Sequence, residues 1–222
     1  MSILQSAVGR KIFMAITGLL MFLFLVIHML GNSSLFIGPD GLNAYAEFLH
    51  SLGAGVWIFR LVMAVLFIFH VILGIQLTAE NRDARPIQYM HKKDLRTTVA
   101  AKSMIYTGVV ILGFVVYHLL HFTVRITNPE ISQGIDAAGR FDVYTMVVLS
   151  FENFAIAAVY IIAMFALLFH ISHGLSSMLQ TLGLNNGPIL GTLQKIGYVV
   201  AAAIALGYVT FPVSVLLGIV KV

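Results

Sequence analysis

Four histidines each lie deep inside a different long apolar stretch of this chain: His28, His70, His118 and His170. An imidazole in hydrocarbon is costly to place, so an intramembrane histidine indicates a functional site. A single such histidine would be explained more simply by a hydrogen bond to a neighbouring helix. Four of them at matched depths on separate helices instead predict two metals, each with two axial histidine ligands.

The composition predicts an integral membrane protein. The 222 residues are 59% hydrophobic and only 10% charged, and the mean hydropathy is +0.96. A soluble domain of this size could not bury so much apolar surface. The first apolar run, from Ile12, is too long for a cleavable signal peptide and lacks a small-residue cleavage site. The net charge of +4 comes from membrane-flanking loops, so no nucleic-acid partner is expected.

The absence of cysteine restricts the cofactor chemistry. It excludes thiolate-ligated haem, iron–sulfur clusters and covalent haem attachment through a Cys-x-x-Cys-His motif. The sequence also offers no glycine-rich strand-to-helix loop for a nucleotide. Any haem must therefore be held by histidine without covalent links.

Apolar runs long enough to span a bilayer occur five times, which predicts an all-α, single-domain protein over residues 1–222. The expected spans are Ile12–Ile37, Val56–Ala79, Ala100–Thr123, Tyr144–Leu182 and Ile189–Val220. Turn-forming or charged segments separate them: Gly38–Gly41, Glu80–Arg96, Asn128–Pro129 and Asn185–Pro188. The fourth span is long enough to protrude or tilt, and Pro212 is expected to kink or end the fifth.

Basic residues predict the orientation. Nine Lys and Arg residues fall on the side of the N-terminus and four on the other side. Because cytoplasmic loops carry the excess of Lys and Arg, the N-terminus is expected to be cytoplasmic.

Depth along the spans pairs the histidines. At 1.5 Å per residue, His28 and His118 lie about 25 and 24 Å above the cytoplasmic ends of two ascending helices. On two descending helices, His70 and His170 lie roughly 15–18 Å from that side. The first four helices are thus expected to form a bundle with two sites, one above the other. We call His28 and His118 the upper pair, and His70 and His170 the lower pair.

Repeated glycines accompany these histidines. Thr17-Gly18 and Thr107-Gly108 each place a glycine ten residues before a ligand of the upper pair, near the level of the lower pair. Phe69-His70 and Phe169-His170 are each followed one turn later by a glycine, Gly74 or Gly174. A missing side chain leaves room for a flat macrocycle or its edge. Small residues that merely let helices pack are the alternative.

Two further histidines leave the choice of ligand open on periodicity alone. His121 lies one turn beyond His118, and His173 one turn beyond His170. The repeated phrases favour His118 and His170, and the spare imidazoles are expected to bond a propionate, a backbone carbonyl or a quinone oxygen. His50 and His91 are expected in solvated loops.

These phrases, in this order, resemble the cytochrome b membrane-anchor subunit of succinate dehydrogenases and fumarate reductases, in the single-chain, five-helix, di-haem type. The resemblance covers nearly the whole chain and includes Gly9–Lys11, Thr17-Gly18, His28 with Gly31-Asn32, Phe69-His70, Thr107-Gly108 with His118, and Phe169–Gly174. It implies two haems b, the distal one held by His28 and His118 and the proximal one by His70 and His170. It also implies a multi-pass protein of the bacterial cytoplasmic membrane.

The resemblance further implies the partners and the reaction. A flavoprotein and an iron–sulfur subunit would handle succinate or fumarate, and this chain would pass electrons to or from menaquinone near the distal haem without acting on succinate itself. Dimerisation of the whole complex stays open. Some relatives use a glutamate for protons where this chain has Leu168. Glu47, Glu152 and His121 are the remaining candidates for contact with quinone.

Two other readings stay open. The chain could anchor a different quinone-linked dehydrogenase, such as a hydrogenase or a formate dehydrogenase. A metal-ion transporter is the second alternative, but it predicts acidic residues beside the histidines, and none lies within a turn of the four. The basic segment Arg82–Arg96, with Arg10 and Lys11, either docks the iron–sulfur partner or is simply the positive-inside loop.

Overall fold

The computed structural model describes residues 3–84, 98–184 and 189–222, and apart from one isolated β-bridge their regular structure is helical. Five helices are long and apolar enough to cross a membrane, as predicted. They are α1 (Ala7–Asn32), α3 (Ala54–Asp83), α4 (Val99–His118), α7 (Phe154–Thr181) and α8 (Leu190–Leu216). Shorter helices connect or extend them: η1 (Ile3–Gln5), η2 (Ser33–Ile37), α2 (Pro39–Ser51), η3 (Leu119–Thr123), α5 (Pro129–Ser132) and α6 (Val143–Glu152).

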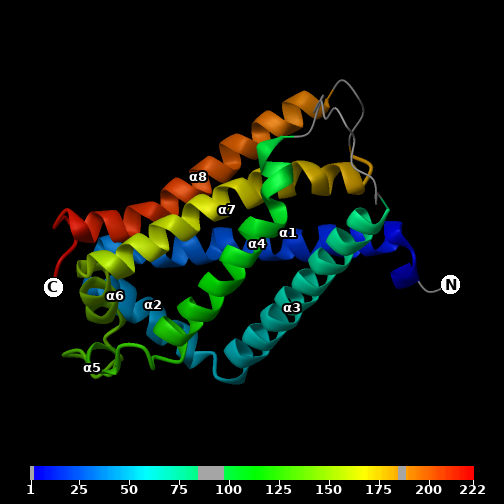
Figure 1. Ribbon diagram of the computed structural model, residues 1–222. Helices are drawn as coiled ribbons and strands as arrows, with labels where there is room; N and C mark the ends of the chain where they lie inside the picture. The colour runs from blue at the N-terminus through cyan, green and yellow to red at the C-terminus, as the bar shows by residue number, and fades with distance from the viewer. Residues whose placement is uncertain (1–2, 85–97, 185–188) are drawn as a thin grey trace.

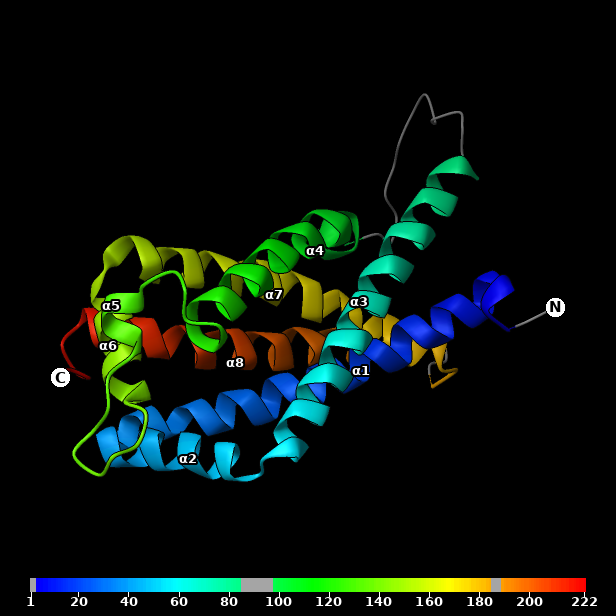
Figure 2. The ribbon, with the colours of Figure 1, turned by 90° about the horizontal axis from the view of Figure 1, so that it is seen from below.

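The long helices cross between two ends of an elongated molecule. The N-terminus lies at one end, and the C-terminus lies at the other beside α2, α5 and α6 (Figures 1 and 2). Helix α7 is central, because it packs along α8 and also contacts α4 and α1. Helix α3 packs chiefly on α1. The chain is therefore a multi-pass membrane protein in which α7 organises the bundle.

The fourth predicted span is two helices rather than one. Helix α6 ends at Glu152, and α7 begins at Phe154. Between them Asn153 adopts an extended backbone, and its side-chain oxygen accepts hydrogen bonds from the amides of Ala155 and Ile156. An asparagine that caps a new helix satisfies the free amides of its first turn, so the expectation of one continuous Tyr144–Leu182 helix was wrong.

Two further expectations about the ends of elements were wrong. The predicted turn at Gly38–Gly41 instead opens helix α2, with Pro39 in its first turn, so His50 lies on a helix and not in a loop. Helix α8 continues past Pro212 to Leu216, so the expected end at Pro212 was wrong, while the alternative of a kink there stays a prediction. Residues 85–97 and 185–188, which include His91 and most of the predicted basic segment, lie outside the described residues.

The packed core lies between α7 and its neighbours. Small and apolar residues of α7 pack against α8, among them Ala163 and Leu167 against Ala201 and Ile204. By contrast, Leu73 is the one residue of α3 that is fully buried, and large apolar side chains cover the outer face of that helix. Such a distribution suits helices whose outer faces contact lipid acyl chains.

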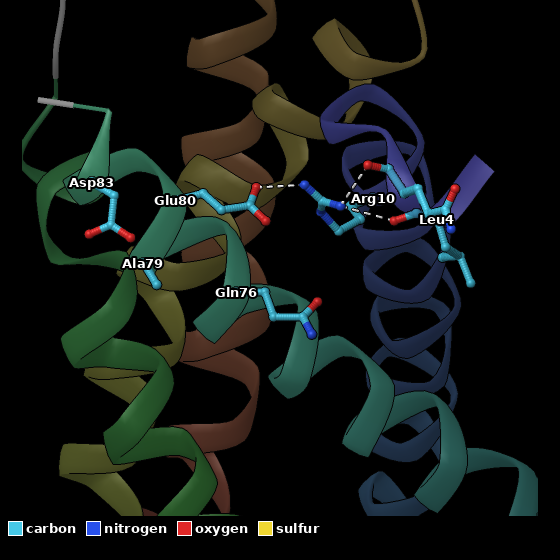
Figure 3. A pocket seen from close by; sticks show the side chains of 7 residues that line it. Leu4, Arg10, Gln76, Ala79, Glu80 and Asp83 are labelled. Carbon is cyan, nitrogen blue, oxygen red and sulfur yellow. Dashed lines mark hydrogen bonds and ion pairs between the residues drawn. The ribbon is translucent and has the colours of Figure 1, made fainter. Parts of the chain in front are cut away.

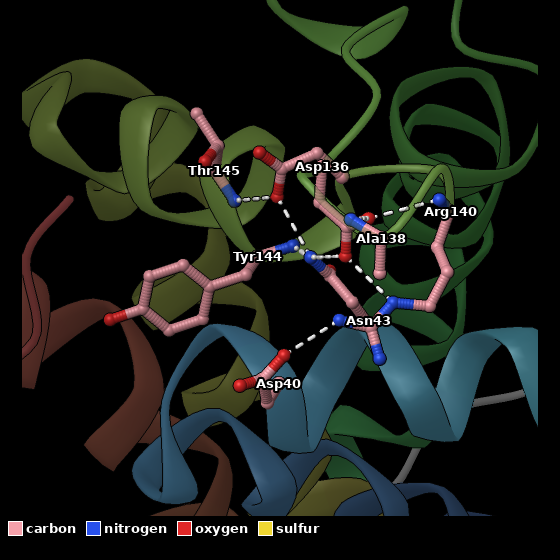
Figure 4. A network of polar contacts seen from close by, with 8 residues as sticks. Asp40, Asn43, Asp136, Ala138, Arg140, Tyr144 and Thr145 are labelled. Atoms are coloured by element: carbon pink, nitrogen blue, oxygen red, sulfur yellow. Dashed lines mark hydrogen bonds and ion pairs between the residues drawn. The ribbon is translucent and has the colours of Figure 1, made fainter.

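A buried polar network ties α2 to the segment before α6 (Figure 4). The side-chain nitrogen of Asn43, which is fully buried, donates to Asp136 and Asp142, and its oxygen accepts from the amide of Tyr144. Arg140 forms ion pairs of 2.7 Å with Asp136 and Asp40. Desolvation opposes ionisation of Asp136, but hydrogen bonds from Arg140 and Asn43 outweigh it and hold the pKa of this carboxyl below its usual range. The network closes this end of the bundle.

Candidate functional site

The structure brings the four deep histidines together in the two predicted pairs. His28 of α1 lies beside His118, the last residue of α4, with ring centroids 5.9 Å apart. His70 of α3 lies beside His170 of α7, with centroids 6.3 Å apart. The rings of both pairs are half-buried. Each pair thus joins two helices that are distant in sequence.

In the lower pair, His70 is held by a threonine of the neighbouring helix. Its Nδ1 lies 3.0 Å from Oγ1 of Thr17, and that hydroxyl also lies 2.9 and 3.1 Å from the carbonyl oxygens of Phe13 and Met14. A carbonyl can only accept, so the threonine hydrogen points to a carbonyl and its oxygen accepts from Nδ1–H of His70. This tautomer leaves Nε2 of His70 with a free lone pair, as a metal ligand requires.

The same arrangement holds His170. Its Nδ1 lies 3.2 Å from Oγ1 of Thr107, which lies 3.0 and 3.1 Å from the carbonyl oxygens of Ser103 and Met104. Sequence reasoning used the repeated Thr-Gly phrase only for its glycine and missed the role of the threonine. The signal was nevertheless present, because the threonine repeats at the same spacing.

Glycines of the same phrases face the lower imidazoles. A Cβ added at Gly18 would lie 3.5 Å from Cε1 of His70, and one at Gly108 would lie 3.6 Å from Cε1 of His170. The prediction that these glycines lie at the level of the lower pair is confirmed. A Cβ at Gly74 would meet Met14 at 3.5 Å, whereas one at Gly174 would meet nothing within 4 Å.

The upper pair has different surroundings. The side-chain nitrogen of Asn32 donates to the backbone oxygen of His28 at 2.7 Å and lies 3.3 and 3.4 Å from its two ring nitrogens. Phe24 stacks on the same imidazole, with centroids 5.3 Å apart. Nδ1 of His118 lies 3.4 Å from the phenol oxygen of Tyr160.

The spare histidines differ from each other. His121 is almost completely buried, at 1% exposure, with Nδ1 at 2.9 Å from the Tyr160 hydroxyl and Nε2 at 3.1 Å from that of Ser150. Both nitrogens thus contact protein hydroxyls, which is not the contact with a quinone, propionate or carbonyl that was expected from the sequence. His173 is half-buried on α7, one turn beyond His170.

The two predicted carboxylates lie near the end that carries the C-terminus. Glu47 is on α2 and Glu152 is the last residue of α6, and both are exposed. Their contact with quinone stays a prediction.

The chain matches no family model, no curated protein and no solved structure. Its chemistry must therefore be argued from the donor atoms. In residues 3–84, 98–184 and 189–222, no group of three or more His, Cys, Asp or Glu side chains could hold a metal ion. A bare transition metal usually takes at least three protein ligands, so two-histidine sites need most of the coordination from another group.

At the end of the bundle that carries the N-terminus, Arg10 lines an open pocket between α1 and α3 (Figure 3). Its guanidinium forms a 2.7 Å ion pair with Glu80 and donates to the carbonyls of Leu4 and Gln5. The contact with Glu80 joins the first two spans. Docking of a partner by Arg10 stays a prediction, and here part of its charge is already neutralised by Glu80.

Proposed function

We propose that this chain is a di-haem cytochrome b that anchors a succinate:quinone oxidoreductase in the membrane. Its role would be to pass electrons between an iron–sulfur subunit and a quinone, most simply menaquinone. The observation that supports this most is that four imidazoles form two pairs, each from two separate helices.

The spacing of the rings suits one iron between each pair. Metal–nitrogen bonds of about 2 Å, with about 1 Å more from each nitrogen to its ring centre, separate two axial imidazole centroids by roughly 6 Å. The measured separations are 5.9 and 6.3 Å.

The donor set favours a haem over a transported ion. Two imidazoles per site leave four coordination positions, which a porphyrin supplies, whereas a site for a bare ion would bring carboxylates or further histidines. Gly18 and Gly108 add no side chain beside the lower imidazoles, and the space next to Gly174 is open. These residues fit a flat macrocycle.

The residues of the chain would hold and insulate the haems. His28 and His118 would ligate the upper one, and His70 and His170 the lower one, with Nε2 of the lower imidazoles turned to the iron by the threonine contacts at Nδ1. A bound haem would supply reversible one-electron redox chemistry, and two histidines held to it would leave no place for oxygen or a substrate. The surrounding apolar helices exclude water, so the arrangement suits electron transfer across hydrocarbon.

The distribution of charge supports an orientation. The end that carries the N-terminus bears Arg10, Lys11, Lys102 and Lys195, and the positive-inside rule makes this the cytoplasmic face. The lower pair is nearer to that face and would receive electrons from the soluble subunits. Quinone would then react nearer the upper pair.

Haem quantitation tests the proposal directly. The chain, purified with its bound partners, is expected to contain two non-covalent haems b by pyridine haemochrome assay, with low-spin spectra. One haem per chain would contradict the pairing, and none would contradict the class. Co-purification of a flavoprotein with succinate dehydrogenase activity supports the succinate complex. A hydrogenase or formate dehydrogenase in its place would assign the chain to the alternative anchor.

A further inference from the structure

Four side chains and one carbonyl form a continuous hydrogen-bonded row beside the upper pair. From Nδ1 of His118 the row passes 3.4 Å to the Tyr160 hydroxyl and 2.9 Å on to Nδ1 of His121. From Nε2 of His121 it passes 3.1 Å to the hydroxyl of Ser150, which donates over 2.7 Å to the carbonyl of Met146. Each hydroxyl and each ring nitrogen in the row can be donor or acceptor, but the carbonyl can only accept.

That last acceptor gives the whole row one direction. The single hydrogen of Ser150 points to Met146, so Ser150 accepts from Nε2–H of His121. Neutral His121 then has an unprotonated Nδ1, which accepts from the hydroxyl of Tyr160. The only hydroxyl hydrogen of Tyr160 is engaged in that bond, so its oxygen accepts from Nδ1–H of His118. Nε2 of His118 is left with its lone pair.

The row comes from four elements, and its three members beyond His118 of α4 are buried. Ser150 of α6 is 0% exposed, His121 of η3 is 1% exposed and Tyr160 of α7 is 7% exposed. Helix η3 is a π-helix, closed by a 2.7 Å bond from the amide of Val124 to the carbonyl of Leu119. Single π-turns often occur at functional sites. In a buried environment a reversed or broken row would leave polar atoms unpaired, which is costly.

We propose that Tyr160, His121 and Ser150 are positioning residues that hold His118 in the Nδ1–H tautomer and so aim Nε2 at the metal. This inference rests on the proposed function, because it assigns His118 as a haem ligand. It adds three residues that do not touch the iron. A hydrogen bond accepted from Nδ1–H makes the imidazole a stronger donor, so the row also lowers the midpoint potential of the upper haem.

The tautomers can be measured whether or not haem is bound. Protein labelled with ring-¹⁵N histidine is expected to show His121 protonated at Nε2, with the signal assigned by its loss in a His121→Gln variant. Protonation of His121 at Nδ1 would overturn the direction of the row. This readout does not need haem. A wrong tautomer would therefore overturn the row alone, whereas a wild-type chain without haem would overturn the proposed function.

Variants test the effect on the metal. Tyr160→Phe is expected to keep two haems and to raise the midpoint potential of the upper haem alone. Ser150→Ala removes the link to the carbonyl, so His121 is expected to populate both tautomers and the upper haem to be retained less well. Ser150→Thr restores a hydroxyl and is expected to restore both properties.

Ser214→Ala provides the matched control. Ser214 is a buried serine whose hydroxyl donates to the carbonyl of Phe211 on its own helix, as Ser150 does on α6, but it lies outside the row. Unchanged potentials and tautomers are expected there. If Tyr160→Phe and Ser150→Ala left the His121 tautomer and the upper potential as in the wild type, the row would be only structural packing and the proposal would be wrong.

Discussion

The two histidine pairs are built in different ways. In the lower pair, each imidazole bonds one threonine and faces one glycine of a neighbouring helix, and the arrangement occurs twice. In the upper pair, Nδ1 of His118 bonds the hydroxyl of Tyr160, while the ring nitrogens of His28 lie near the side-chain nitrogen of Asn32 on the same helix. The lower level therefore uses the same Thr-Gly phrase twice, whereas the upper level uses one row of different side chains.

If the histidines hold the proposed haems, the two levels would prepare their ligands differently. Thr17 and Thr107 select the tautomer of the lower imidazoles through carbonyls of their own helices, so each imidazole is prepared once its helix packs on one neighbour. The nitrogen of Asn32 lies almost equally far from both ring nitrogens of His28 and selects neither. We infer that preparation at the upper level depends on His118, and thus on α6 and α7 as well as α4.

The largest expected effect is loss of the whole site formed by the lower pair. His70→Ala or His170→Ala is expected to reduce the haem content from two to one per chain, since one axial imidazole cannot replace two. Docking of the soluble partners is also expected to weaken, because the lower pair is nearer their side. Pyridine haemochrome assays and co-purification measure both, with His173→Ala as the control. Two haems in the His170→Ala variant and one in the His173→Ala variant would assign the ligand on α7 to His173.

Removal of an upper ligand is expected to separate two activities. His118→Ala should abolish upper-haem binding and turnover with quinone, while succinate oxidation with a soluble dye continues, because electrons reach the dye before this level. Both activities and haem content are measured on the same membranes. Retained quinone activity with two haems would show that His118 is not the ligand. Loss of both activities would mean that assembly of the soluble subunits depends on this haem.

A smaller effect is expected from filling the space beside the lower rings. An alanine Cβ at Gly18 or Gly108 would meet the imidazole edge at ordinary van der Waals distance, so the fold should persist. The methyl group would nevertheless occupy space next to the metal, and haem content should fall towards one per chain. Gly113→Ala on α4, where a Cβ would meet nothing within 4 Å, is the matched control. Equal haem content in all three variants would reduce these glycines to simple packing residues.

The sequence predicted most of the helices and both histidine pairs because these features depend on periodicity and rise per residue. Depth alone paired His28 with His118, which needs no knowledge of side-chain contacts. The break at Asn153 was missed because an asparagine within an apolar run caps a helix only when the chain turns there. The partners of His121 were also missed, because Ser150 and Tyr160 lie 29 and 39 residues away, and no local pattern connects them.

The smallest expected effect compares the two ways of holding Nδ1. Thr17→Val and Thr107→Val keep the shape of the side chain but each removes one acceptor of a lower imidazole. The selected tautomer then keeps only the backbone bond to Met14 or Met104. Loss of such an outer contact typically weakens metal binding 10–100-fold, and we expect about the lower limit because each variant removes one hydrogen bond at the lower site. Both haems should remain at stoichiometric loading, but the lower one should dissociate about ten-fold faster and its midpoint potential should rise.

Haem transfer to apomyoglobin measures the rate, and a redox titration measures the potential. Thr210→Val on α8, where the hydroxyl bonds only the carbonyl of Gly207, should change neither. If the threonine variants shifted the upper haem instead, the assignment of the two levels would be reversed.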